Sequence, residues 1–326
     1  MDRQRAARRL LTAAALASTA AWSAATDTPL AALRWTEPTL ALDALTRAPP
    51  ECLSAVAVKA ERARVEVGRA AFRAPALLGG QAARLGLSCE SCHVNGRGNR
   101  AFRFPGLSGA PGTADVTAPL MSAHRGDEVF DPKPIPDLAR PAKVSRATGD
   151  PALAKFIRGL IVEEFDGREP PPAVLDGLVA YVRAIDARVC PTSGDAPLGS
   201  EFAIDAAIRG VAAARERQAS GDRESARLML ASARSALGRL GERYPALPAS
   251  RSRLLAADDE LLSLQRAIGS GGPKLDEHFR RWLARADRWR VPLLRDASRS
   301  LYDPKRLAAA LGECGATCAT ASRSTR

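Results

Sequence analysis

The stretch Ser88-Cys89-Glu90-Ser91-Cys92-His93 contains the pattern Cys-x-x-Cys-His. Two thiols at this spacing can add across the vinyl groups of a haem as thioethers, and the histidine that follows then serves as an axial ligand of the iron. The alternative is a redox Cys-x-x-Cys beside a chance histidine, but the chain has only three histidines, and no βαβ pattern surrounds the motif. The motif therefore predicts one covalently attached haem c held by Cys89, Cys92 and His93.

The composition favours an all-α fold. The 326 residues are rich in alanine, leucine and arginine, which are good helix formers, and runs of β-branched residues are scarce. A chain of this length can hold two domains that each bury a core.

The first 25 residues have the features of an export signal. Arginines at positions 3, 5, 8 and 9 precede a weakly apolar stretch, and Ser23-Ala24-Ala25 offers small residues for cleavage. Residues 1–25 are therefore predicted to be a signal peptide, and the mature protein is predicted to be periplasmic or otherwise exported. No later stretch is long and apolar enough to span a membrane.

The charge of the chain bears on its partners. The net charge is +12; residues 1–25 hold four arginines and one aspartate, so the mature chain would carry 12 − 3 = +9. Basic surfaces attract nucleic acid, acidic lipid or acidic proteins. Nucleic acid does not suit an exported protein, so an acidic redox partner is the expectation that fits a haem. Arginine enrichment through genome composition alone is the competing explanation.

Three segments resemble the bacterial di-haem cytochrome c peroxidases and their relatives. The first is Gly68-Arg69-Ala70-Ala71-Phe72 followed by Leu77-Leu78 and the haem motif, the second is Thr117-Ala118-Pro119-Leu120-Met121 with His124, and the third is the helix expected over 174–185. The resemblance covers about residues 51–190. It implies a cytochrome c-like haem domain in which the glycine and aromatic residue of the first helix pack against the last helix. The family carries two Cys-x-x-Cys-His motifs in tandem and this chain has one, which implies a single-haem relative.

The residue opposite His93 decides the chemistry of the iron. Two protein ligands favour electron transfer, whereas an open position admits peroxide. Met121 is favoured by a small margin as the sixth ligand, His124 is the alternative, and an open site is the third possibility. Pro105 is a candidate to accept a hydrogen bond from His93 Nδ1 through its carbonyl, as a proline at a similar spacing does in many c-type cytochromes; an ordinary loop proline is the competing reading.

Four cysteines remain besides the haem pair. Cys52 and Cys190 bracket the haem domain, and because the first and last helices cross in cytochrome c folds, we expect a disulfide between them. Cys314 and Cys318 are predicted to form a local disulfide, with metal binding as the alternative.

The flanks of the haem domain differ in character. Residues 26–50 hold several prolines and are predicted to be an extended lead-in. Residues 191–199 form a Pro/Ser/Gly linker. The chain beyond it has helical periodicity and is predicted to be a small antiparallel bundle over 200–326, of unknown role.

Three functions follow from these features. The first is an exported mono-haem cytochrome that transfers electrons. The second is a haem peroxidase that reduces hydrogen peroxide, with His124 as acid–base and Arg125 or Glu128 assisting. In the third, the bundle is a binding module that tethers the cytochrome to a complex.

Overall fold

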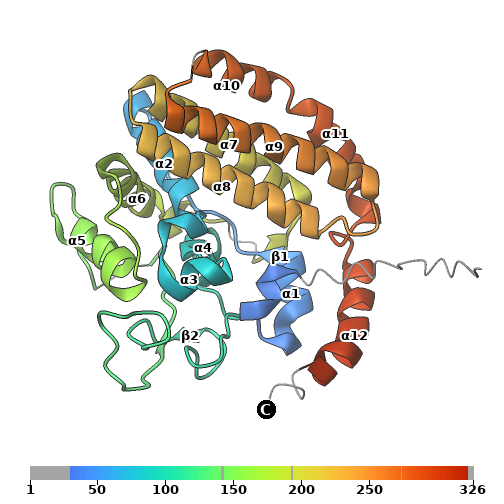
Figure 1. Ribbon diagram of the computed structural model, residues 1–326. Coiled ribbons are helices and arrows are strands. Elements are labelled where there is room, and N and C mark those ends of the chain that lie inside the picture. Colours follow the sequence, from blue (N-terminus) through green and yellow to red (C-terminus); the bar gives the residue numbers. More distant parts are fainter. Residues whose placement is uncertain (1–29, 141–142, 192–193, 273, 322–326) are drawn as a thin grey trace, which may run out of the picture.

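The chain folds into a mostly helical structure, as its composition predicts. This computed structural model describes residues 30–140, 143–191, 194–272 and 274–321, with the backbone alone over 313–321. Its main helices are α1 (Ala41–Thr46), α2 (Lys59–Phe72), α3 (Gly80–Leu85), α4 (Cys89–Cys92), α5 (Ala152–Gly159), α6 (Pro172–Ala184), α7 (Ser200–Ala219), α8 (Arg223–Glu242), α9 (Pro248–Ser270), α10 (Leu275–Ala284), α11 (Asp287–Asp296) and α12 (Pro304–Ala321). Figure 1 shows α7, α8 and α9 side by side above α3 and α4, and α4 contains Cys89 and Cys92.

Helices α2 and α6 cross with their backbones in contact. A Cβ atom on Gly68 of α2 would lie 1.9 Å from the carbonyl oxygen of Gly177 in α6. One turn further along α2, the ring of Phe72 packs on Tyr181 of α6, with centroids 5.1 Å apart. The glycine and aromatic residue of the first helix therefore meet the last helix of the segment, as the resemblance implies.

The lead-in is helical rather than extended, so that part of the prediction is wrong. Residues 31–35 and 38–40 form 3-10 turns, and α1 follows. Pro38 begins a turn here because its fixed φ suits the first helical position. Trp35 is buried, and its carbonyl accepts a hydrogen bond from the backbone of Arg103 at 3.0 Å. The segment thereby packs against the loop that follows the haem motif.

The chain beyond the linker is helical, as predicted, but α12 packs on α1 rather than on the other C-terminal helices. Asp222 caps α8, because its side chain accepts a hydrogen bond from the backbone N–H of Ser225. Pro248 is the first residue of α9, and α10 and α11 are separate helices.

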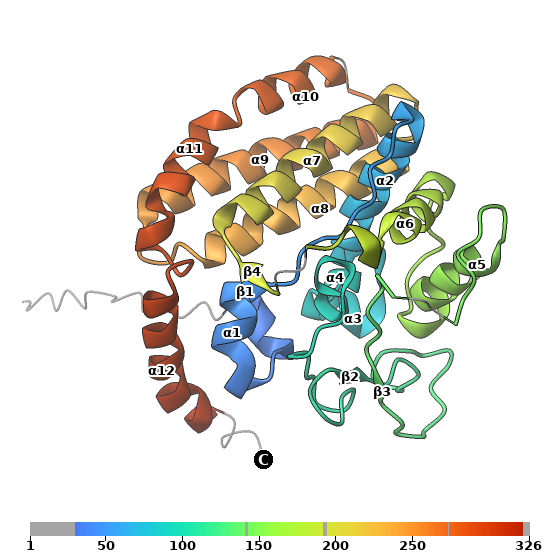
Figure 2. The same cartoon turned by 180° about the vertical axis from the view of Figure 1, so that it is seen from behind.

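Residues 51–190 and the bundle share one hydrophobic core. Helices α7 and α8 pack on α2, and the buried side chains of both units form a continuous cluster. Ser232 Oγ of α8 donates a hydrogen bond to the carbonyl of Ala70 in α2 at 2.6 Å. The linker is attached as well, because β4 (Ala196–Pro197) pairs antiparallel with β1 (Arg47–Ala48). Figure 2 shows this ribbon beside α1, with α12 along the same side.

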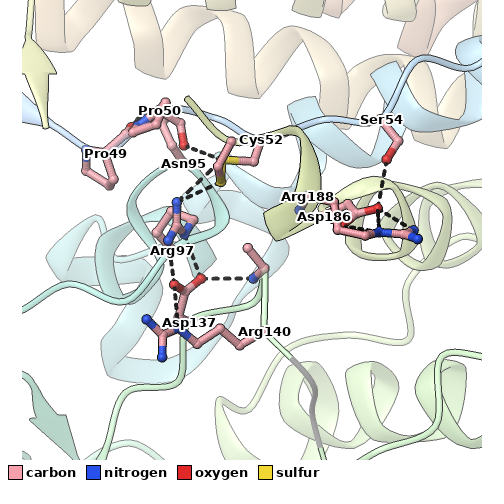
Figure 3. The surroundings of a disulfide bond; sticks show 12 residues. Pro49, Pro50, Cys52, Ser54, Asn95, Arg97, Asp137, Arg140, Asp186 and Arg188 are labelled. Atoms are coloured by element: carbon pink, nitrogen blue, oxygen red, sulfur yellow. Dashed lines mark hydrogen bonds and ion pairs between the residues drawn. A yellow bond between two sulfur atoms is a disulfide. The ribbon is translucent and has the colours of Figure 1, made fainter. Parts of the chain in front are cut away.

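The predicted Cys52–Cys190 disulfide is present in the structure (Figure 3). The Cα atoms are 4.9 Å apart and the bond closes a separation of 138 residues. The backbone N–H of Asp186 donates to the Cys52 carbonyl at 2.9 Å, so the two ends of the segment are also joined by main-chain bonding. In the chain-entropy account, a loop of this size stabilises the fold by about 5 kcal/mol.

Two other predictions concern residues that the structure does not describe. The signal peptide over 1–25 lies outside the described residues, and the side chains of Cys314 and Cys318 also lie outside them. Within the described ranges, no helix combines the length and the apolar character needed to cross a membrane.

The helix crossing leads to a prediction about Gly68. We expect Gly68→Ala to destabilise the protein by about 2–3 kcal/mol, because the added methyl group would overlap the backbone of α6. Gly238→Ala in α8 is the matched control: nothing lies within 4 Å of its Cβ position, so it should stabilise by about 0.5–1 kcal/mol through helix propensity alone. Urea unfolding of the two variants measures both values; equal stabilities would contradict the close crossing.

Candidate functional site

The motif forms a single helical turn because a serine precedes each of its two cysteines and the two serines cap the turn. Ser88 is the N-cap of α4 and takes part in a reciprocal capping box with Ser91, whose Oγ accepts the Ser88 N–H at 3.1 Å. The turn closes with a hydrogen bond from the His93 N–H to the Cys89 carbonyl at 2.8 Å. Cys89 and Cys92 are three residues apart on this turn and therefore lie on one face of it.

His93 follows the turn with one ring nitrogen already bonded. Its Nδ1 lies 3.0 Å from the carbonyl oxygen of Pro136, which leaves Nε2 as the ring nitrogen without a hydrogen bond to that carbonyl. The acceptor is thus Pro136, and the assignment of this role to Pro105 is wrong. Pro105 is closer in sequence, but the chain returns to His93 only 43 residues later, after the β2–β3 ribbon of Thr113–Ala114 and Lys133–Pro134. The ring of Phe72 packs beside His93, with centroids 6.3 Å apart.

Both cysteines of the motif are free thiols, and their surroundings favour the neutral forms. Desolvation raises the pKa of Cys89 and Cys92 and lowers the pKa of His93. Reactive thiols of redox Cys-x-x-Cys sites have lowered pKa values instead. The imidazole is held neutral, which is the form that binds a metal ion.

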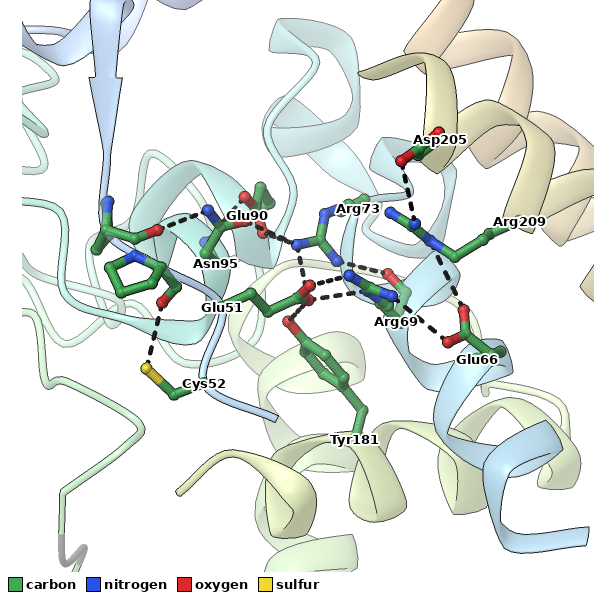
Figure 4. Close-up of polar contacts among 12 residues, drawn as sticks. Glu51, Cys52, Glu66, Arg69, Arg73, Glu90, Asn95, Tyr181, Asp205 and Arg209 are labelled. Carbon is green, nitrogen blue, oxygen red and sulfur yellow. Dashed lines mark hydrogen bonds and ion pairs between the residues drawn. The ribbon is translucent and has the colours of Figure 1, made fainter. Parts of the chain in front are cut away.

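A buried cluster of charges surrounds the back of the motif (Figure 4). Arg73, at the end of α2, contacts Glu51 at 3.1 Å and Glu90 of the motif at 3.2 Å. Glu51 also pairs with Arg69 and accepts a hydrogen bond from Tyr181 Oη at 2.8 Å. Two arginines and two glutamates meet here, so each buried charge has a partner of opposite sign, and an unpaired charge would be costly at this depth.

The carboxylates of this cluster respond differently to their burial. Burial by itself would raise the pKa of Glu51, but the guanidinium groups of Arg73 and Arg69 outweigh it and the pKa is lowered. For Glu90, burial prevails over Arg73 and the pKa is raised. Glu51 is therefore the firmly ionised member.

Asn95 connects the cluster to the lead-in. It adopts a left-handed conformation with φ of 54°, which asparagine tolerates better than most residues. Its N–H donates to Glu90 at 2.9 Å, its Oδ1 accepts from Arg73 at 3.1 Å, and its Nδ2 donates to the Pro49 carbonyl at 2.8 Å. Three hydrogen bonds of Asn95 therefore hold the turn after His93 in place.

The bundle covers this cluster. The ring of Phe202 in α7 lies 5.3 Å from the Arg73 guanidinium carbon, and Arg209 of the same helix lies 3.8 Å from Glu66 of α2. An open pocket of about 320 Å³ lies between the lead-in, the linker and α7, lined in part by Glu51, Arg69 and Arg209. Helix α7 therefore covers Arg73, while Glu51 borders the pocket.

The two candidate sixth ligands occupy different environments. Met121 is 1% exposed and belongs to the hydrophobic core. The side chain of His124 is 67% exposed, and its Nε2 lies 3.9 Å from an Asp166 carboxylate oxygen. The turn between them is held by Ser122, whose Oγ donates to the Glu163 carbonyl at 2.5 Å.

The residues proposed for peroxide chemistry do not converge. Arg125 pairs with Glu164 at 2.7 Å, and Glu128 is exposed with φ of 60°. All three side chains are therefore exposed at the surface.

Several residues of the site were not found from the sequence. Glu90 lies inside the motif and Asn95-Gly96 is a turn signal, so these two carried a local clue. Glu51, Arg73 and Pro136 carried none, because only the crossing of distant segments brings them to the motif.

Comparison with known proteins adds no assignment: no family model, no curated protein and no solved structure matches the chain. Across the part of the chain that the structure describes, no group of three or more His, Cys, Asp and Glu side chains is placed to hold a metal ion. A haem iron takes a single histidine from the motif, so this finding does not bear on it.

The charge cluster leads to a prediction about Glu51. Glu51→Gln should destabilise by about 3–5 kcal/mol at pH 7, because Arg73 would keep a buried charge without its nearest partner. Glu61→Gln, which removes an exposed pair with Arg64, should cost less than about 1 kcal/mol.

The same variant has an expected pH dependence. The folded-state pKa of Glu51 lies below the ordinary value of 4.5, so its contribution is present above that value and is lost as the pH falls through the folded pKa. Urea unfolding between pH 7 and pH 3 should show the gap between wild type and Glu51→Gln closing at the acid end. A gap that stays constant would contradict an ionised Glu51.

Proposed function

We propose that this protein is an exported mono-haem c-type cytochrome that transfers electrons in the periplasm. The observation that carries the proposal is the donor set: two free thiols on one face of a turn, followed by an imidazole whose Nδ1 is held by a carbonyl. These residues fit a covalently attached haem, with Cys89 and Cys92 as the thioether positions and His93 Nε2 as the axial donor. Once bound, such a group supplies one-electron chemistry.

The scaffold around the donor set supports the same proposal. The crossing of α2 and α6 at Gly68 and Gly177 has the residue types and order that the resemblance to the cytochrome c peroxidase family implies. Phe72 lies on both Tyr181 and His93 and so connects this crossing to the motif. A cytochrome c-like domain accounts for these contacts together.

Met121 is the sixth ligand we propose. A thioether is a soft, weakly polar ligand that suits a dry pocket, and Met121 is fully buried. His124 is directed to solvent and toward Asp166. Two protein ligands leave no position for peroxide, which favours electron transfer over a peroxidase reaction.

The partner we propose is an acidic redox protein. A mature chain of net charge +9 attracts an acidic surface and raises the rate of encounter. Salt screens such attraction, so the transfer rate should fall as ionic strength rises.

The attachment of haem has a direct test. Wild-type protein exported to the periplasm of a host that matures c-type cytochromes should retain its pigment after denaturation in acid and organic solvent, and its mass should include one haem. The double variant Cys89→Ala, Cys92→Ala should lose the covalent pigment because no thioether can form. The matched control Cys52→Ser, Cys190→Ser removes two other cysteines and should keep it. Wild-type protein without covalent pigment would overturn the proposal.

The axial ligand has a separate test. Met121→Ala should convert a low-spin ferric spectrum with a weak far-red band into a high-spin one, because the thioether is lost. His124→Ala should leave the spectrum unchanged. A Met121→Ala protein that stays low-spin, or a His124→Ala protein that turns high-spin, would contradict the assignment.

A further inference from the structure

The carbonyl that accepts from His93 belongs to an irregular segment that other contacts must hold. Pro136 follows the β2–β3 ribbon, and its neighbours are fixed by two main-chain bonds. The N–H of Ile135 donates to the Gly112 carbonyl at 2.9 Å, and the N–H of Leu138 donates to the Gly96 carbonyl at 3.1 Å. The second bond reaches the turn that directly follows His93.

A bidentate ion pair joins the same two segments. Arg97, four residues after His93, donates from Nε and Nη2 to the two carboxylate oxygens of Asp137, both at 2.7 Å. Asp137 directly follows Pro136, and its Oδ1 also accepts the N–H of Ala139 at 2.9 Å. Both charged side chains are 20% exposed, and the hydrogen bond from Arg97 holds the pKa of Asp137 below its ordinary value although burial opposes it.

The disulfide lies behind this ion pair. Arg97 Nη1 is 3.1 Å from Cys190 Sγ and 3.4 Å from Cys52 Sγ, so the guanidinium group is placed between the disulfide and Asp137 (Figure 3). The segment after Asp137 is bonded to the same region, since the N–H of Ala187 donates to the Ala139 carbonyl at 3.2 Å. The guanidinium group is therefore held on two sides.

We propose that Arg97 and Asp137 are positioning residues for the axial imidazole. Their ion pair keeps the Pro136 carbonyl within hydrogen-bonding distance of His93 Nδ1, and the Cys52–Cys190 disulfide holds Arg97 in place. The proposal rests on the proposed function, because it assigns these residues to the electronic properties of that same site. A firm hydrogen bond from Nδ1–H makes the opposite nitrogen a stronger donor and fixes the ring orientation, and a stronger donor favours the oxidised iron.

A second ion pair in the same chain provides the control. Arg234 of α8 and Asp258 of α9 form a bidentate pair at 2.8 and 3.0 Å with similar partial burial. It joins two helices of the bundle rather than the segments that meet at His93. Loss of either pair should cost similar stability, but only the loss of Arg97–Asp137 should reach the imidazole.

The experiment compares Asp137→Asn, Arg97→Gln, Arg97→Lys and Asp258→Asn in the full-length exported protein. We expect Asp137→Asn and Arg97→Gln to increase the equilibrium constant for reduction by up to about tenfold, because a looser Nδ1 hydrogen bond makes the opposite nitrogen a weaker donor. Arg97→Lys keeps the charge without the planar fork and should give an intermediate increase. Asp258→Asn should leave the reduction midpoint at the wild-type value.

A second readout does not depend on electron transfer. The chain has only three histidines, so selective ¹⁵N-histidine labelling allows the His93 ring proton to be followed by NMR. Its exchange with solvent should speed up in Asp137→Asn and Arg97→Gln and stay unchanged in Asp258→Asn.

The outcomes separate the two proposals. Wild-type values of both readouts in Asp137→Asn and Arg97→Gln, or equal shifts in Asp258→Asn, would overturn the positioning role. If Asp137→Asn does not accumulate, the same two measurements are made on Arg97→Lys, and wild-type values of both would overturn the positioning role. If the wild-type protein carries no covalent pigment, only the proposed haem function is overturned. The positioning of the His93 ring by Arg97 and Asp137 can still be tested by ring-proton exchange on the chain without haem.

Discussion

The contact on which the structure most depends is the crossing of α2 and α6 at Gly68 and Gly177. Because neither residue has a side chain, the two backbones meet directly. This closeness lets Phe72 lie on Tyr181 and beside His93, one turn along the helix. It also brings Arg73, at the end of the same helix, to the carboxylates behind the motif. A wider spacing would separate the imidazole from its packing and the charges from their partners.

Two kinds of interaction support the motif, one on each side of it. Behind it, Glu51, Arg73 and Glu90 form a dry charge cluster that α7 covers. Such clusters are costly to break and contribute little net stability compared with an apolar core, so their value lies in fixing one arrangement of the groups. On the imidazole side, a backbone carbonyl and a bidentate ion pair hold the ring. The charge cluster therefore fixes the position of the motif, and the carbonyl with its ion pair fixes the orientation of the His93 ring.

The bundle belongs to this arrangement rather than to a separate unit. Ser232 bonds to the backbone of α2, and Phe202 lies on Arg73. Removing water from the cluster strengthens every charge interaction within it. The helices of residues 200–296 thus contribute to the environment of a motif more than 100 residues earlier in the chain.

The sequence by itself determined the helical class, because that depends on local propensity. It also determined the Cys52–Cys190 pair, because these cysteines bracket a segment whose end helices the resemblance expects to cross. Only the tertiary structure decided that Pro136 rather than Pro105 accepts from His93, that the lead-in is helical, and that Glu51 lies between two arginines. These outcomes depend on which distant segments come together. Spacing along the chain does not encode that, since a carbonyl 43 residues away can lie closer in space than one 12 residues away.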